Sequence, residues 1–123
     1  MHDPTAGAEI LLRAHELITR DRQNSYSHPL DDYSRTVSIY NALKGDDVMT
    51  AEDGILFMMC VKLSRLMNEL DNGLDIPDNT VDLAGYVGCL NMARTRRREH
   101  DEEMERILEV TSYHFKTGET HNE

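Results

Sequence analysis

The sequence predicts an all-helical domain, on the basis of three observations. Apolar residues recur at steps of three and four along the long segments, helix start and stop signals bound those segments, and few segments read as strands. We expect four to five helices around a central antiparallel helix hairpin, in one domain over residues 1–116 with a flexible tail at 117–123. A chain of 123 residues is long enough for one modest core.

The N-terminal part of the chain predicts two helices. The first runs from about residue 5 to 22, after a start signal at Asp3 and Pro4. A polar break closed by a proline follows, because proline disfavours helix at the residue before it. The second helix begins at Pro29, has acidic residues in its first turn and ends at Gly45.

The central hairpin is predicted from two helical segments joined by a short acidic bend. The first begins at Thr50, in a pattern close to a capping box, and is apolar at every position over 55–61. A domain of this size has few elements to surround such a helix, so we expect a second copy to cover it, in a homodimer or a dimer of dimers. The second segment starts near Pro77 and contains Gly85 and Gly88. Each glycine costs about 1 kcal/mol of helix propensity, so close approach of another backbone or a ligand is expected there.

From Arg94 onward the sequence predicts a further, solvated helix. Its charges are spaced four apart, as in Arg97 and Asp101, which is typical of an exposed helix. A narrow apolar stripe for docking consists of Met104, Ile107, Leu108 and Thr111.

Composition excludes several classes of function. The formal net charge of −10 disfavours nucleic acid as a partner, although a small anionic ligand or a divalent cation stays compatible with it. No apolar segment approaches the 18 residues of a membrane span, and the N-terminus lacks the basic and apolar regions of a signal peptide. Cys60 and Cys89 lie inside apolar runs, so we expect reduced thiols and a cytoplasmic protein.

A cluster of charges is predicted at the mouth of the hairpin. It consists of Lys62, Arg65, Glu69, Asp78 and Asp82. Steps of three and four place the first three on one side of one helix and the two aspartates on one side of the next. Counting outward from the bend, Glu69 lies level with Asp78, and Arg65 with Asp82.

Three interpretations of this cluster are open. In the first, ion pairs such as Arg65–Asp82 hold the hairpin together. In the second, the three carboxylates bind a hard divalent cation while the two cations grip a phosphate. In the third, the basic pair binds an anionic ligand without chemistry.

Two other polar residues also have a structural and a functional interpretation. His28 either bonds the backbone where the helix at Pro29 begins or contacts a ligand. Asp53 is first a cap residue and second a ligand of some group. The sequence has no zinc-like spacing, no serine–histidine–aspartate order and no glycine-rich phosphate loop.

Three stretches, "DRQNSYSHPLDDYSR", "EDGILFMMCVKLSR" and "DNTVDLAGYVG", resemble a small family of phage-encoded helical proteins over roughly residues 10–95. The family pattern is an Arg…Tyr-Gly-His-Pro loop, a Lys-x-x-Arg helix and an Asp-hydrophobic-Ala-Gly-Tyr helix. The corresponding residues are Arg22, Tyr26, His28, Pro29, Asp53, Lys62, Arg65, Asp82, Gly85 and Tyr86. The layout also resembles the all-α nucleoside triphosphate pyrophosphatases of the MazG type.

The MazG resemblance implies a dimer or tetramer of helix pairs that holds Mg²⁺ or Mn²⁺ on carboxylates. It also implies cleavage of a (deoxy)nucleoside triphosphate to monophosphate and pyrophosphate. The family carboxylates come as Glu-x-x-Glu and then Glu-x-x-Asp, and only the last carries over cleanly, to Asp82. Lys62 and Arg65 stand where the first pair is expected. Two basic residues in place of two acids favour binding of the phosphates with fewer metal ions, or loss of hydrolysis.

From this resemblance we expect a MazG-like nucleotide pyrophosphohydrolase of phage nucleotide metabolism, working in the host cytoplasm. The expected metal ligands are Glu69, Asp78 and Asp82, the expected substrate-binding residues are His28, Lys62, Arg65 and Tyr86, and the expected catalytic residues are Asp82, Lys62 and Arg65. The alternative is a non-catalytic member with a degenerate site, which binds a nucleotide or another protein.

Overall fold

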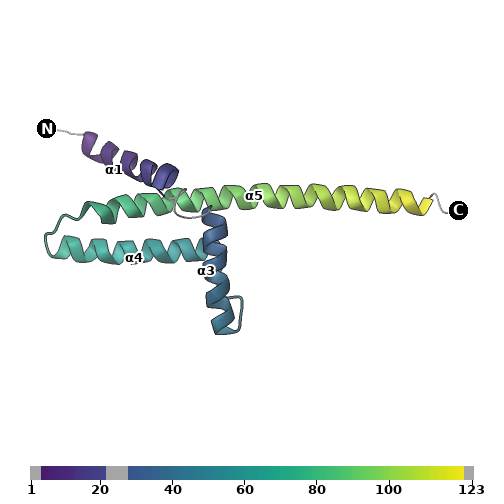
Figure 1. Ribbon diagram of the computed structural model, residues 1–123, viewed down its shortest axis with the longest axis horizontal. Helices are drawn as coiled ribbons and strands as arrows, with labels where there is room; N and C mark the ends of the chain where they lie inside the picture. The colour runs from purple at the N-terminus through teal and green to yellow at the C-terminus, as the bar shows by residue number, and fades with distance from the viewer. Residues whose placement is uncertain (1–3, 22–27, 121–123) are drawn as a thin grey trace.

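Four α-helices and one π-helical turn make up the described part of the chain, which is residues 4–21 and 28–120 of a computed structural model (Figure 1). They are α1 (Thr5–Glu16), the π-helical turn η1 (Leu17–Asp21), α3 (Pro29–Lys44), α4 (Ala51–Asp71) and α5 (Pro77–Thr120). These residues contain no strand, which confirms the all-helical prediction. The motif residues Arg22 and Tyr26, and the end of the predicted tail at 121–123, lie outside the described residues.

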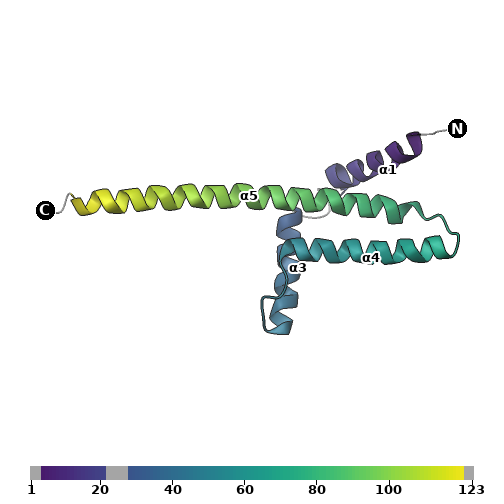
Figure 2. The same ribbon diagram turned by 180° about the vertical axis from the view of Figure 1, so that it is seen from behind.

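The long helix α5 is the axis on which the other elements are arranged. Both views show α4 running antiparallel along the first half of α5, with α3 crossing where α4 begins (Figures 1 and 2). Helices α1, α3 and α4 all contact α5. The short connection between α4 and α5 makes them antiparallel neighbours, so the predicted central hairpin is confirmed.

The ends of α3 follow from local chemistry. His28 is the N-cap residue, and its Nδ1 accepts a hydrogen bond from the backbone N–H of Leu30 at 3.1 Å. Pro29 occupies the first turn, where its missing N–H costs nothing. Gly45 ends the helix with a φ of +78°, a left-handed conformation that glycine adopts without strain.

The core is small and lies where α3, α4 and α5 meet. Its buried residues are Tyr33, Ala51, Ile55 and Ala93, and the partly buried side chains around them are Leu30, Met58, Tyr86 and Leu90. No residue of α5 beyond Ala93 belongs to this cluster. The body of the molecule is therefore built on the first half of α5.

Close packing explains two of the helical glycines. A Cβ atom on Gly88 would lie 2.5 Å from Cδ1 of Ile18, so η1 packs against α5 at this point. A Cβ atom on Gly54 would lie 2.9 Å from Cγ1 of Val37, where α3 crosses α4. A Cβ atom on Gly85 would meet no described atom within 4 Å. The sequence predicts close approach of a backbone or a ligand at both glycines; the structure has a side chain at Gly88 and no close backbone at Gly85.

The predicted helix boundary at Arg94 is absent. α5 is continuous from Pro77 to Thr120, because no proline or glycine interrupts the run after Gly88 until the helix is nearly complete. All residues over 96–116 are exposed, so the apolar stripe expected to dock packs against no described residue.

Within one chain, the outer face of α4 is exposed to solvent, although the sequence predicts that this helix is covered on all sides. The exposed apolar residues there are Leu56, Phe57, Leu63, Met67 and Leu70, and their exposed fractions run from 45% to 70%. None of the described helices combines the length and the apolar character needed to cross a membrane.

Candidate functional site

An ion pair between Lys62 and Asp82 links the two helices of the hairpin. The Lys62 Nζ lies 2.7 Å from the Asp82 Oδ2, and the two side chains are 12% and 33% exposed. The sequence predicted this partner for Asp82 to be Arg65. A short pair that is largely withdrawn from water is held firmly, because separating it would leave a poorly solvated charge.

Arg65 lies elsewhere on α4. Three residues along a helix correspond to a rotation of about 300°, so Arg65 is displaced sideways from Lys62. Its side chain is exposed and lines a shallow hollow whose other lining residues all belong to α4. It forms no ion pair with the described residues.

Glu69 is buried in the bend of the hairpin. Its Oε1 accepts a hydrogen bond from the backbone N–H of Ile76 at 2.7 Å, and its Oε2 accepts one from Nδ2 of Asn79 at 2.9 Å. Only 5% of the residue is exposed. One oxygen thus binds the connection and the other binds the first turn of α5, a role that spacing alone did not indicate.

The remaining acid of the predicted cluster, Asp78, faces α1. Its Oδ1 lies 3.7 Å from Nη2 of Arg13, and the two side chains are 79% and 52% exposed. Asp78 and Asp82 line one groove between α1 and α5, and the other lining residues are Arg13, Glu16, Leu17 and Val81. Sequence reasoning missed Arg13 and Glu16, because no spacing rule relates residues so distant along the chain.

The groove combines acidic and basic side chains. Glu16, Asp78 and Asp82 contribute carboxylates, while Arg13 and Lys62 contribute cations next to the two aspartates. In the described parts of the chain, no three histidine, cysteine or acidic side chains gather closely enough to hold a metal ion. Mg²⁺, however, is commonly bound by one or two carboxylates together with substrate phosphates. The groove contains two such carboxylates on α5, and Glu69, the third predicted ligand, is not among its lining residues.

The two other predicted substrate contacts lie outside this groove. His28 caps α3 through the backbone of Leu30, which is the structural interpretation of that residue. Tyr86 packs against the core cluster. The structure therefore brings together Lys62, Asp82 and Asp78 around α5, and places His28 and Tyr86 in other surroundings.

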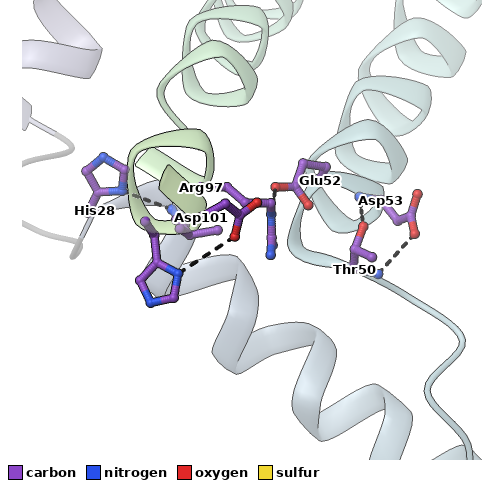
Figure 3. A network of polar contacts seen from close by, with 8 residues as sticks. His28, Thr50, Glu52, Asp53, Arg97 and Asp101 are labelled. Atoms are coloured by element: carbon purple, nitrogen blue, oxygen red, sulfur yellow. Dashed lines mark hydrogen bonds and ion pairs between the residues drawn. The ribbon is translucent and has the colours of Figure 1, made fainter. Parts of the chain in front are cut away.

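The start of α4 contains a second group of polar contacts (Figure 3). Thr50 and Asp53 form a reciprocal capping box, with hydrogen bonds of 3.0 and 3.2 Å between side chain and backbone N–H. The hydrogen bond from the backbone of Thr50 lowers the pKa of Asp53 below its ordinary value. Asp53 is therefore a cap residue, the first of its two interpretations.

Beside the capping box, Glu52 is joined to Arg97 of α5 (Figure 3). Burial raises the pKa of Glu52. The hydrogen bond from the Arg97 guanidinium, the positive charge of Arg97 and the hydrogen bonds from the Glu52 backbone and Thr50 together outweigh burial, so the pKa lies below its ordinary value. The pKa of Arg97 is raised by the same hydrogen bond. This pair fastens the start of α4 to α5 near the edge of the core.

The chain is similar in sequence to one protein family and to a phage protein. The family described as a domain of unknown function, DUF6378, matches residues 9–94. The gene 55 protein of Mycobacterium phage L5 is 33% identical over 81 residues, which are 66% of this chain and 49% of the phage protein. The chain thus spans about half the length of that relative. No solved structure matches the chain.

Proposed function

The chain belongs to the DUF6378 family, and we propose that it is a MazG-like nucleotide pyrophosphohydrolase. It would cut a (deoxy)nucleoside triphosphate to monophosphate and pyrophosphate in phage nucleotide metabolism, as a homodimer or a dimer of dimers in the host cytoplasm. The observation that carries the proposal is the groove between α1 and α5. Two aspartates one helical turn apart line it, with a cation beside each.

The cations of the groove are suited to triphosphate binding. Lys62 lies against Asp82 with little exposure, so it presents a fixed positive charge beside the groove. Arg13 forms a long, exposed ion pair with Asp78, a kind of pair that contributes between 0 and about 1 kcal/mol. Turning the Arg13 guanidinium from Asp78 toward a phosphate therefore costs little. Charge stabilisation of the phosphates would be the main contribution of the protein.

The acids of the groove are suited to a hard cation that enters with the nucleotide. Asp78 and Asp82 stand four residues apart on α5, so their carboxylates project from the same side of the helix. Mg²⁺ or Mn²⁺ bound to the triphosphate would supply Lewis-acid activation of the attacked phosphorus and of a water molecule. Glu16, on the opposite wall, is placed to orient that water or the ribose.

A second candidate is a non-catalytic member that binds a nucleotide or a protein. It is favoured by the position of Glu69, the third expected metal ligand, whose two oxygens are both engaged by the bend of the hairpin. Because both oxygens of Glu69 accept hydrogen bonds within the fold, the acids that remain for hydrolysis are the two aspartates of the groove and Glu16.

Pyrophosphate release from a panel of nucleoside and deoxynucleoside triphosphates, with Mg²⁺ or Mn²⁺, tests the proposal on the full chain. We expect release with at least one nucleotide, and a loss of about 100-fold or more in kcat for Asp82→Asn. Arg13→Gln should mainly raise KM, because it removes a phosphate contact. Asp71→Asn is the matched control, since this acid is exposed at the end of α4 and lies outside the groove.

Two results would overturn the catalytic proposal. One is the absence of pyrophosphate release with every nucleotide. The other is release that Asp82→Asn and Glu16→Gln both leave unchanged, which would place the chemistry outside the groove. If nucleotides raise the melting temperature without turnover, and Lys62→Met removes that rise, the binding-only candidate is correct.

A further inference from the structure

A single chain exposes much more surface than a folded monomer of its mass. Its accessible surface is 9434 Å², whereas the scaling relation for monomeric proteins gives about 6,700 Å² at 14.1 kDa. The excess is about 2,700 Å², and a standard interface takes only about 800 Å² from each partner. The exposed surface is therefore large enough for an interface with a second protein.

We propose that a second copy of the chain covers this surface and that the two copies exchange arms. The distal arm is the part of α5 over residues 99–117. In the exchanged dimer, the distal arm of each copy packs along the outer face of α4 in the other copy.

The distal arm has an apolar stripe that continues an interface already present in the fold. Steps of four, three and four relate the stripe residues Met104, Leu108, Thr111 and Phe115, with Ile107 beside them. The same helical face carries Tyr86, Leu90 and Ala93, which pack on α3 and α4 in the first half of α5. The face that packs in the body thus continues along the arm, where none of the described residues of the same chain covers it.

The outer face of α4 offers a matching stripe. Its residues are Leu56, Cys60, Leu63, Met67 and Leu70, at steps of four, three, four and three. This spacing is that of the seam between two packed helices. All five residues are exposed, and none is charged.

Charge selects α4 of the partner, rather than the partner's arm, as the surface that each arm covers. The distal arm has six acidic and two basic residues over 99–117, so two arms side by side would repel. Over residues 54–68, α4 has Lys62 and Arg65 and no acid. The stripe of the acidic arm therefore meets a segment without acidic side chains on the partner's α4, whereas it would meet further acids on the partner's arm.

The lengths of the two helices allow both contacts to form at once. Ala51, at the start of α4, shares the core cluster with Ala93. Beyond Ala93, α5 continues for 27 residues (94–120), while α4 has 21 residues. These lengths are about 40 Å and 32 Å at the rise of an α-helix. A two-fold axis near Arg97 therefore lays each arm along the partner's α4 and makes the same contact twice. Figure 1 shows the arm leaving the body at this point.

Cysteine cross-linking tests the exchange directly. The chain has two cysteines, of which Cys60 lies exposed in the stripe of α4 and Cys89 is buried. A two-fold axis near Arg97 places Thr111 level with Cys60 of the partner subunit. With a short bismaleimide cross-linker, we expect Thr111→Cys to give a covalent dimer whose linked peptides contain residues 60 and 111. Adding Cys60→Ser should abolish that dimer, and Arg106→Cys, on the opposite side of the arm, should not produce one.

Sedimentation without any ligand supplies the second measurement. We expect the wild-type chain to be dimeric at micromolar concentration, Leu108→Glu to be monomeric and Arg106→Glu to stay dimeric. A wild-type monomer overturns the proposal. So does a dimer that links through Cys60 alone, because that result indicates pairing of α4 with α4. The contact does not depend on nucleotide chemistry, so loss of pyrophosphatase activity leaves it standing.

Discussion

At the scale of single residues, Glu69 shows how a charged side chain can serve the fold. It is an acid with little contact with water, and each oxygen accepts a hydrogen bond from an uncharged donor of the connection or of α5. The N-terminus of α5 is close by, where the helix dipole favours negative charge. The carboxylate thus stabilises the turn that sets α4 beside α5.

Replacement of Glu69 should separate this structural role from metal binding. Glu69→Ala leaves the N–H of Ile76 and the amide of Asn79 without acceptors, and we expect a loss of about 2–3 kcal/mol in the free energy of unfolding. Glu69→Gln keeps one acceptor and the shape, so it should cost clearly less. Urea denaturation measures both, with the exposed Asp71→Ala as the control.

The opposite outcome would identify a ligand. If Mn²⁺ raises the melting temperature of the wild-type chain and Glu69→Gln abolishes that rise with little change in the metal-free stability, then Glu69 binds metal and the bend is not its main role.

Which charges meet across the hairpin was only partly predictable from the sequence. Spacing correctly placed Lys62 and Asp82 on facing helices, but it favoured Arg65 as the partner of Asp82. The rotation of α4 about its axis decides between the two cations, and packing of Ile55 and its neighbours in the core fixes that rotation. Local spacing contains no information about it.

At the scale of elements, the helix ends were the most predictable feature. Gly45 and Thr50 act through their own backbone or side chain, so their effects are local and readable. The continuity of α5 was not predicted, because the change to a highly charged composition at Arg94 was interpreted as a new element. A change in composition alters what a helix contacts, and it does not break the helix.

The pair between Glu52 and Arg97 predicts how the attachment of α4 to α5 depends on pH. The pKa of Glu52 in the folded state is lowered from 4.5, so its contribution is complete above that value and is lost as the pH falls through the folded pKa. We expect Glu52→Gln to lower the free energy of unfolding by about 0.5–1 kcal/mol at pH 7. At pH 3 the difference from the wild type should be much smaller.

Denaturation at several pH values measures this difference. Glu99→Gln is the control, because this acid is exposed on the same helix as Arg97 and forms no ion pair with the described residues. A Glu52→Gln deficit that is the same at pH 3 and pH 7 would show that the side chain acts by packing rather than by charge.

At the scale of the whole molecule, the candidate groove depends on contacts that no sequence pattern contains. Arg13 and Asp78 are far apart in the chain and meet only because η1 packs against Gly88 and holds α1 beside α5. The distal arm lies beyond residue 94, where the match to the DUF6378 family ends. The groove is therefore built from the part of the chain that the family shares, and the arm from the part beyond it.

Exchange of arms predicts that unfolding depends on protein concentration. When two chains must separate as they unfold, a tenfold rise in concentration stabilises the dimer by about 1.4 kcal/mol. For a dimer of this size, we expect a rise of about 3 °C in the melting temperature, because its unfolding entropy is that of roughly 250 residues. Leu108→Glu should remove the concentration dependence, whereas Arg106→Glu should keep it. Calorimetry across two decades of concentration measures the effect, and a constant melting temperature for the wild-type chain would show that its exposed stripes stay uncovered.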